Sequence, residues 1–298
     1  MGKIIKIITT VCTVLIFHIA FTSNADADCK IGVLAKRGAP KTMKKWVATA
    51  TYLSHQTGEK CSIIPLQFTA IEPAVASRKI DFLLANPSFY VEMEKKYNAQ
   101  AIATMVNSSG GQAINNFGGV IFVRKDSPIK TLADIKGKNY MCVKHSSLGG
   151  AHMAKRLLLE HNIDPDKDTA TYLEGGKHDN VVLAVKNGSV DVGTVRSDTL
   201  ERMQNEGKIR ISDFRILNQI KDDFPFAHST RLYPEWPMAA LANTNKNLAN
   251  KVTTALQAML PDTQAAKSAH IAGWTTPADY SPVSDCLRAI KHGAFTQD

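Results

Sequence analysis

The chain has 298 residues, enough for about two ordinary domains. Hydrophobic residues make up 44% and charged residues 21%, so a substantial core can form and a mainly disordered or fibrous chain is excluded. The formal net charge is +9, but the lysines are dispersed without interleaved aromatic residues, so we expect no nucleic-acid partner.

Residues 1–27 have the pattern of a secretory signal. Two lysines precede an apolar run over 7–21, and residues 25–27 supply a small-x-small cleavage pattern. The run of about 15 residues is shorter than the roughly 20 that a membrane-spanning helix needs. We therefore expect cleavage after Ala27 and an exported protein of the periplasm that is peripheral to the membrane.

Four cysteines follow the predicted cleavage point. Lipid attachment at Cys29 is the alternative to a free mature chain, although the preceding Ala-Asp is a poor match to the small residues expected there. Cys29 and Cys61 each begin an apolar strand, and the first residues of parallel neighbouring strands lie within bridging distance. We expect a Cys29–Cys61 disulfide that stabilises the fold by roughly 3–4 kcal/mol. Cys142 and Cys286 form either a second disulfide or two buried thiols.

Short apolar strands alternate with amphipathic helices through the first part of the chain. The expected strands and helices, in order, are 31–34, 42–56, 62–66, 70–78, 80–84 and 87–97. This alternation predicts a parallel α/β sheet.

The same pattern recurs 110 residues later. Ala74-Val75 and Ile80-Asp81 recur as Ala184-Val185 and Val190-Asp191. The repeat indicates two similar lobes, and too little sequence remains after them for a third. We therefore predict two lobes joined by two hinge crossovers, an architecture typical of hinge-closing binding proteins. Lobe 1 is expected over 28–120 and 225–298, and lobe 2 over 121–224.

Ligands of open α/β sheets bind beyond the carboxyl ends of the strands, where helices begin. The most informative of these junctions is Ser146-Ser147-Leu-Gly-Gly150. Hydroxyls and free backbone N–H groups at a helix start, beside glycines that permit close approach, can cradle an oxyanion. An ordinary serine N-cap after a tight turn is the alternative.

Three arginines favour the same interpretation. Arg37 and Arg196 lie at predicted junctions, and Arg231 lies in the segment that returns to the first lobe. Guanidinium groups suit oxoanions with several acceptor oxygens. The alternative is that each arginine lies on a solvated face.

Other junction residues have both a structural and a binding interpretation. Asp198 and Glu201 have the spacing of a capping box, and His178 could simply begin a helix. Asn86 is a plausible N-cap, and Tyr90, four residues later, is by default a packing residue.

Enzymatic chemistry finds little support in the sequence. There is no GxSxG nucleophile elbow, HExxH zinc pair or P-loop. A hydrolase that uses His178 and Asp198 is the remaining enzymatic alternative, but no nucleophile-base-orienter set accompanies them. We expect no catalytic activity, no cofactor and no metal.

These junctions resemble the periplasmic phosphonate, phosphite and phosphate-binding proteins of the PhnD type. The motifs that carry the resemblance are Asn86-Pro-Ser-Phe-Tyr90, Ser146-Ser-Leu-Gly149, Gly176-Lys-His178-Asp and Arg196-Ser-Asp198. The resemblance implies a type II periplasmic-binding-protein fold. It also implies an oxyanion head group bound by Tyr90, Ser146, Ser147, His178 and Asp198. The family pattern at the helix start is Ser-Thr-Ser-Gly-like, and here Leu148 replaces one hydroxyl.

Segments 117–122 and 228–237 are more similar to the sensory input domains of tetrathionate-responsive histidine kinases, a branch of the same superfamily. Sulfur oxoanions such as tetrathionate are therefore candidate ligands beside phosphonate and phosphate. We expect an exported solute-binding protein that captures a small oxyanion between two lobes and delivers it to the permease of an ABC transporter. The alternative is a sensory binding protein that presents the anion to a separate histidine kinase.

Overall fold

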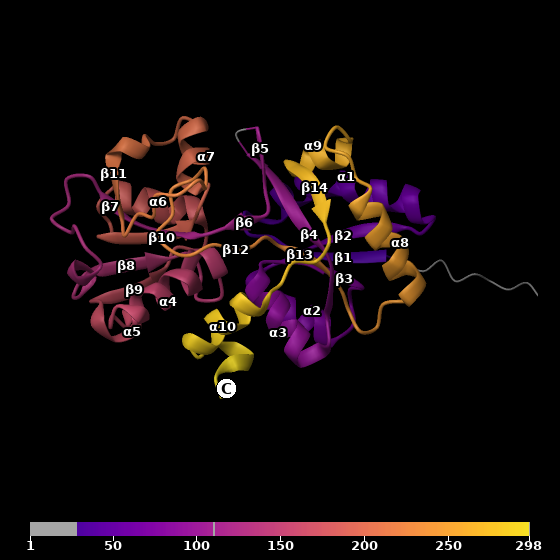
Figure 1. Ribbon diagram of the computed structural model, residues 1–298, viewed down its shortest axis with the longest axis horizontal. Coiled ribbons are helices and arrows are strands. Elements are labelled where there is room, and N and C mark those ends of the chain that lie inside the picture. The colour runs from indigo at the N-terminus through magenta and orange to yellow at the C-terminus, as the bar shows by residue number, and fades with distance from the viewer. Residues whose placement is uncertain (1–28, 110, 298) are drawn as a thin grey trace, which may run out of the picture.

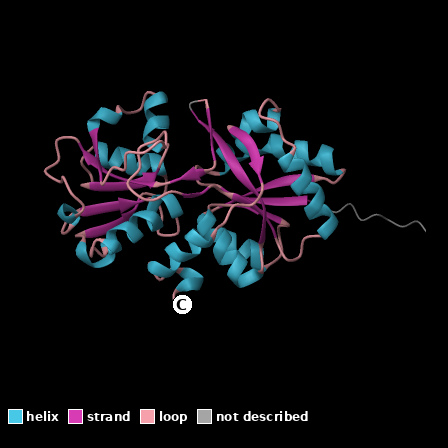
Figure 2. Cartoon of the chain, viewed as in Figure 1, coloured by secondary structure: helices cyan, strands magenta, loops and turns pink. Residues whose placement is uncertain are grey.

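The computed structural model describes residues 29–109 and 111–297, so the predicted signal segment lies outside the described residues. The chain forms two lobes, each with its own sheet (Figure 1). Helices flank the strands of both lobes, which confirms the predicted α/β class (Figure 2). No helix of the described part combines the length and the apolar character needed to cross a bilayer.

Lobe 1 is built from two separate stretches of chain. The first contains β1 (Cys29–Leu34), α1 (Ala39–Thr57), β2 (Cys61–Leu66), α2 (Ile71–Ala76), β3 (Phe82–Leu84), α3 (Pro87–Tyr97), β4 (Gln100–Ser109) and β5 (Gln112–Ile114). The second contains β13 (Pro237–Ala240), α8 (Lys246–Gln257), α9 (Gln264–Ala269), β14 (Ile271–Thr275) and α10 (Ser281–Ala289). The chain therefore returns to the first lobe, as the sequence predicts.

Lobe 2 is a single stretch between these two. It contains β7 (Gly119–Arg124), β8 (Asn139–Cys142), α4 (Met153–Glu160), α5 (Pro165–Asp168), β9 (Thr171–Glu174), α6 (His178–Lys186), β10 (Val192–Arg196), α7 (Thr199–Asn205) and β11 (Phe214–Leu217). A π-helical turn over Leu148–His152 leads directly into α4.

The two sheets have the same strand order. It is β4-β13-β3-β1-β2 in lobe 1, with β14 added beside β4, and β11-β7-β10-β8-β9 in lobe 2. An offset of 110 residues maps β1, β2 and β3 onto β8, β9 and β10, so the internal repeat describes matching strands. In lobe 2, β7 runs antiparallel to both of its neighbours, and in lobe 1 β13 does the same. In lobe 1, β14 and β5 are also antiparallel to β4. The prediction of a parallel sheet missed these antiparallel strands.

Two short strands connect the lobes. β6 (Asn116–Phe117) leads into lobe 2, β12 (Tyr233–Pro234) leads out of it, and the two pair antiparallel between the lobes (Figure 1). The predicted first boundary, residue 120, lies one residue inside β7. The predicted second boundary, residue 225, lies in the connection between β11 and β12.

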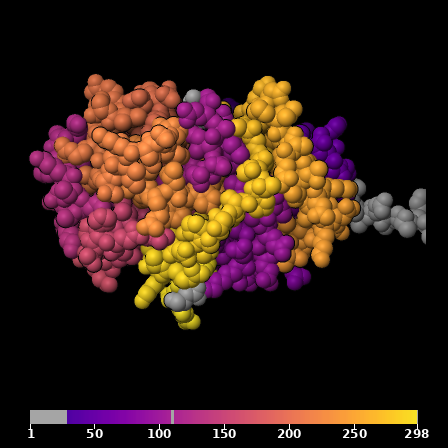
Figure 3. Space-filling model, viewed as in Figure 1, coloured from indigo at the N-terminus to yellow at the C-terminus, as the bar shows by residue number. Residues whose placement is uncertain are grey.

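The C-terminal segment also links the lobes. From lobe 1 it crosses the face of the molecule seen in Figure 3, and α10 packs against α4 of lobe 2. A further link is the Ser88 hydroxyl of α3, which lies 2.8 Å from the His152 Nδ1 of lobe 2, and both side chains are buried.

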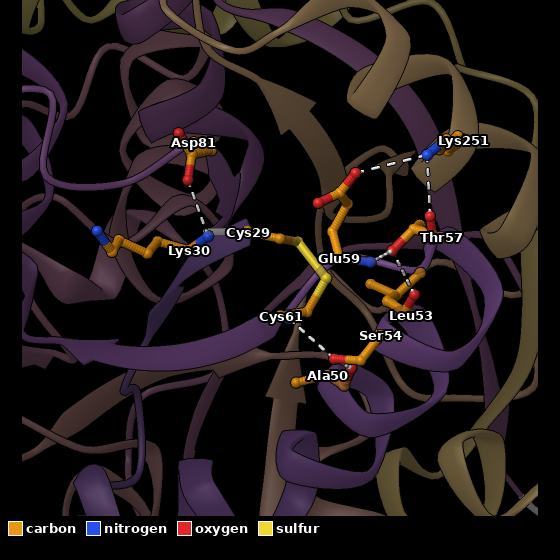
Figure 4. The surroundings of a disulfide bond; sticks show 10 residues. All are labelled: Cys29, Lys30, Ala50, Leu53, Ser54, Thr57, Glu59, Cys61, Asp81 and Lys251. Carbon is orange, nitrogen blue, oxygen red and sulfur yellow. Dashed lines mark hydrogen bonds and ion pairs between the residues drawn. A yellow bond between two sulfur atoms is a disulfide. The ribbon is translucent and has the colours of Figure 1, made fainter. Parts of the chain in front are cut away.

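The disulfide prediction is confirmed. Cys29 and Cys61 are register partners at the start of the parallel strands β1 and β2, and their sulfurs are bonded (Figure 4). The Ser54 hydroxyl accepts a 2.8 Å hydrogen bond from the Cys61 N–H and thereby fastens the bridge to α1. The sequence left open whether Cys142 and Cys286 form a second disulfide or two buried thiols. In the structure both are free and buried.

Candidate functional site

A cavity of about 810 Å³ lies between the two lobes, beyond the carboxyl ends of β1 and β10. A narrow recess of about 10 Å³ adjoins it and shares Leu34, Lys36, His178, Arg196 and Trp236 with it. The recess also reaches Asn86, Phe117, Ser147 and Gly149. Both lobes and one connecting strand therefore contribute to a single space.

The walls of the cavity are strongly basic. Eight basic side chains line it, namely Lys36, Arg37, Lys41, Lys44, Lys45, Arg196, Arg202 and Lys267. Three acidic side chains face them, namely Asp179, Asp198 and Glu206. Such an excess of positive charge in a cleft attracts anions.

Lys36 and Lys45 are two of the lobe 1 cations that line the cavity. They are half-buried, and among the described residues neither ammonium has a carboxylate within ion-pair distance. Each lies about 5 Å from the centre of a tryptophan ring, 5.0 Å from Trp236 for Lys36 and 5.1 Å from Trp46 for Lys45. Loss of hydration, with the nearby charge of Arg196, lowers the pKa of Lys36 to about 7 and that of Lys45 to about 8. An anion between them would relieve this unfavourable charge.

Arg196 is the last residue of β10, and only 6% of it is exposed. Its Nη2 donates to the Glu235 carboxylate at 2.6 Å, and its Nε lies 3.3 Å from the Ser197 carbonyl oxygen. The guanidinium carbon lies 4.3 Å from the centre of the Phe117 ring. Burial disfavours the charged form, but Asp198 and Glu235 outweigh it and raise the pKa of Arg196. Arg196 is therefore a fixed, permanent cation.

His178 is the first residue of α6 and is buried. Burial, together with the charges of Lys36 and Arg196, holds its pKa well below the usual value, so the ring is neutral. Its Nδ1 accepts the backbone N–H of Arg196 at 3.3 Å, which leaves the proton on Nε2. His178 can thus donate one hydrogen bond to an anion without carrying charge.

The serine-glycine junction begins a helix, but not as an ordinary N-cap. Ser147 precedes the π-helical turn, and its side chain makes no capping hydrogen bond. The first N–H groups of that helix have no partners within it, and Ser147 and Gly149 line the recess. A Cβ at Gly149 would lie 2.7 Å from the Cβ of Arg196, so only glycine lets the helix start approach β10 this closely.

The predicted residues differ in where they lie relative to the cavity and the recess. His178, Arg196 and Asp198 line the cavity and Ser147 lines the recess, so the structure brings these four together. Ser146 is adjacent but lines neither space. Tyr90 and Arg231 line neither space, and Arg37 lines the cavity.

Tyr90 and Arg231 line neither the cavity nor the recess, so the geometry lends no support to the prediction that they contact the ligand. Tyr90 is 4% exposed, its ring packs edge-on against Tyr280, and its hydroxyl donates to Glu94. Arg231 is exposed and pairs with Glu160 at 2.7 Å. The first fills the core of lobe 1 and the second is a surface ion pair, which are the structural alternatives that the sequence left open.

Arg37 and Asp198 both form ion pairs within the site. Arg37 of lobe 1 lies 3.3 Å from Asp179 and 3.6 Å from Glu206, both in lobe 2, so it bridges the mouth of the cavity. The Asp198 carboxylate does not cap α7 but lies 3.4 Å from the Arg196 Nε. Its backbone has a φ of 75°, a strained conformation for a residue other than glycine, so the capping-box interpretation is wrong.

Sequence reasoning missed Lys45, Trp236, Asn107 and Glu235. The first three line the cavity, and Glu235 lies behind Arg196. A signal existed for two of them, because Trp236 and Glu235 belong to the segment 228–237 that resembles the tetrathionate-responsive kinases. Nothing in the helical pattern of α1 distinguishes Lys45 from its exposed neighbours. Across the described residues no group of three or more histidine, cysteine, aspartate or glutamate side chains is arranged to hold a metal ion.

Comparisons with known proteins identify the family and the fold. Residues 31–281 match the family described as "ABC transporter, phosphonate, periplasmic substrate-binding protein". The tetrathionate sensor histidine kinase TtrS of Salmonella typhimurium is 32% identical over 263 residues. The matched region is 88% of this chain but 43% of the kinase, so this chain spans less than half of the kinase's length.

Two solved structures share the fold. PhnD1 from Prochlorococcus marinus in complex with methylphosphonate has a TM-score of 0.71 at 14% identity, covering 88% of this chain and 98% of that chain. The binding protein component of an ABC phosphonate transporter from Pseudomonas aeruginosa has a TM-score of 0.72 at 18% identity, covering 89% of this chain and 88% of that chain. With the two matching lobes, these similarities confirm the predicted type II fold. The chain belongs to the family of periplasmic substrate-binding proteins of phosphonate ABC transporters.

Proposed function

We propose that this protein, once exported, captures a small oxyanion between its two lobes and delivers it to the permease of an ABC transporter. The observation that carries the proposal is the excess of positive charge in the interlobe cavity, above all the two lysines without a counter-ion. Loss of hydration is costly for a half-buried cation without a partner, and a bound anion would remove that cost.

In this proposal each lobe contributes to anion binding. Lobe 2 offers the Arg196 guanidinium, the neutral His178 ring and the helix start at Ser147, and lobe 1 offers Lys36. Because a ligand shifts a conformational equilibrium only through differential affinity, contacts from both lobes would favour the closed form. Asp198 has no positive charge to offer, and its distance of 3.4 Å from Arg196 suits a residue that orients the guanidinium.

A second candidate function is sensory. The 32% identity with the tetrathionate sensor kinase extends over 88% of this chain, whereas the solved phosphonate-binding proteins are 14% and 18% identical. This difference favours a sulfur oxoanion such as tetrathionate, presented to a separate histidine kinase. The cavity accommodates either anion class, because guanidinium, ammonium and N–H donors recognise oxygen atoms on phosphorus and on sulfur alike.

The first test is thermal unfolding of the refolded protein with a panel of phosphate, phosphite, methylphosphonate, thiosulfate and tetrathionate. An anion present at 100 times its dissociation constant adds about 2.7 kcal/mol of stability, enough to raise the unfolding midpoint visibly. Arg196→Ala should abolish the shift, and Arg231→Ala, an arginine outside the cavity, should leave it intact. No shift with any anion would contradict the oxyanion assignment.

Whether the bound anion is transported or sensed needs a separate experiment in the source organism. If the protein serves transport, its deletion stops uptake of the radiolabelled anion. If it serves sensing, deletion leaves uptake intact and abolishes the transcriptional response to the anion. The two results distinguish the permease from the histidine kinase as partner.

A further inference from the structure

The side chain that holds Arg196 comes from the connection between the lobes. Glu235 directly follows β12, and its side chain is completely buried. It does not line the cavity. Its Oε1 accepts the Arg196 Nη2 at 2.6 Å, so a carboxylate outside the site determines where a cation inside it lies.

Glu235 is itself held on several sides. Its Oε1 accepts a hydrogen bond from the Asn107 side chain of β4, and its Oε2 accepts the N–H of Trp236 at 3.2 Å. Its backbone N–H donates to the Asn115 carbonyl oxygen at 2.8 Å, which ties the outgoing connection to the incoming one. A carboxylate with this many fixed neighbours is a rigid partner for the guanidinium.

Besides Asp198, whose carboxylate lies 3.4 Å from Nε, a second group that contacts Arg196 belongs to the connections. Phe117 ends β6, and its ring lies 4.3 Å from the guanidinium carbon. Together, Glu235 and Phe117 fix both the direction and the plane of the guanidinium. Nε is directed to the Ser197 carbonyl oxygen and Nη2 to Glu235. Among the described residues no partner is found for Nη1, so that nitrogen remains for a ligand.

We infer that Glu235 is a positioning residue for anion binding. It acts through Arg196 and touches no ligand. By fixing Nη2 it presents Nη1 to the cavity before the anion arrives, so little side-chain freedom is lost on binding. The inference rests on the proposed function in one respect, namely that Arg196 contacts the anion. The fixed orientation of the guanidinium does not depend on that.

A ligand-independent measurement tests the orientation directly. Nitrogen-15 NMR of the arginine side chains should show separate, slowly exchanging Nη signals for Arg196, assigned by their loss in Arg196→Lys. In Glu235→Gln, which keeps the size of the side chain but removes its charge, the separate signals should merge. Freely rotating Nη groups in the unsubstituted protein would overturn the inference whether or not an anion is known.

The second measurement is titration calorimetry with tetrathionate and, separately, methylphosphonate. Glu235→Gln should weaken binding of whichever anion the unsubstituted protein binds by roughly tenfold or more. Glu235→Asp, which keeps the charge, should recover part of the loss. The matched control Glu174→Gln removes an exposed ion pair with Lys144 and should change the affinity less than twofold.

The affinity losses of single and double variants distinguish a positioning role of Glu235 from a general loss of folding. If Glu235 acts through Arg196, the affinity of the double variant Glu235→Gln/Arg196→Lys should equal that of Arg196→Lys alone. Fully additive losses would contradict the inference. Failure of the unsubstituted protein to bind either anion, with separate Nη signals intact, would refute the choice of anions and leave the positioning role supported.

Discussion

Lys36 makes anion binding depend on pH in a way that can be calculated from its environment. Its pKa is lowered from 10.5 to about 7 by loss of hydration and by Arg196, so at pH 7 about half of the free protein carries a neutral Lys36. An anion beside the ammonium favours the proton. Binding should therefore take up protons, and the affinity should fall as the pH rises.

The magnitude follows from linkage. If bound anion keeps Lys36 protonated up to pH 9, the affinity falls roughly 100-fold between pH 6 and pH 9 on account of Lys36 alone. Lys45, with a pKa of about 8, adds a further factor of roughly 10 over the same range. The total decrease is on the order of 1,000-fold, most of it above pH 7.

The assay is titration calorimetry at pH 6, 7, 8 and 9 with an anion that does not itself titrate in this range, such as tetrathionate. Lys36→Met should weaken binding at pH 6 and reduce the dependence to the factor of roughly 10 that Lys45 supplies. Lys36→Arg should reduce the pH dependence equally while keeping the positive charge. A flat profile in the unsubstituted protein, or an unchanged profile in Lys36→Met, would refute the reasoning.

Three further predictions concern the frame around the site. Replacing Cys29 and Cys61 by serine should lower the free energy of unfolding by roughly 3–4 kcal/mol in denaturant titrations, because the bridge closes a loop with a sequence separation of 32. Anion affinity should not change, since the bridge lies at the opposite end of β1 from the cavity. Gly149→Ala should lower the free energy of unfolding by about 1–3 kcal/mol, because the new Cβ would lie 2.7 Å from that of Arg196. It should also weaken anion binding in calorimetry. Unchanged stability would show that the helix start can move. Arg37→Ala removes two half-exposed ion pairs and should lower the free energy of unfolding by less than about 1 kcal/mol. It should nevertheless increase the radius of gyration of the ligand-free protein in X-ray scattering. An unchanged radius would argue against a bridge across the cavity mouth.

The fold was largely predictable because its main signals are periodic and repeated. The 110-residue offset pairs β1 with β8 and β3 with β10, and strand starts at Cys29 and Cys61 predict the disulfide. The antiparallel strands β7 and β13 were not predictable, because a buried strand has the same apolar pattern in either direction. Strand direction depends on how the chain crosses between the lobes.

The site was predictable where local sequence determines position and unpredictable where tertiary packing does. His178, Arg196 and Ser147 follow strands or begin helices, so topology alone brings them to the same edge. Tyr90 lies in the first turn of α3, but its ring packs in the core of lobe 1. Glu235 could be noticed only through the resemblance of segment 228–237, because its role depends on Arg196, 39 positions away in lobe 2.

The most direct test of capture between the lobes is a crystal structure of the protein with the anion of the panel that raises the unfolding midpoint most. We expect the anion to lie in the cavity within hydrogen-bond distance of Arg196 and His178 in lobe 2 and of Lys36 in lobe 1. An anion bound by residues of one lobe only, or bound elsewhere on the surface, would contradict it.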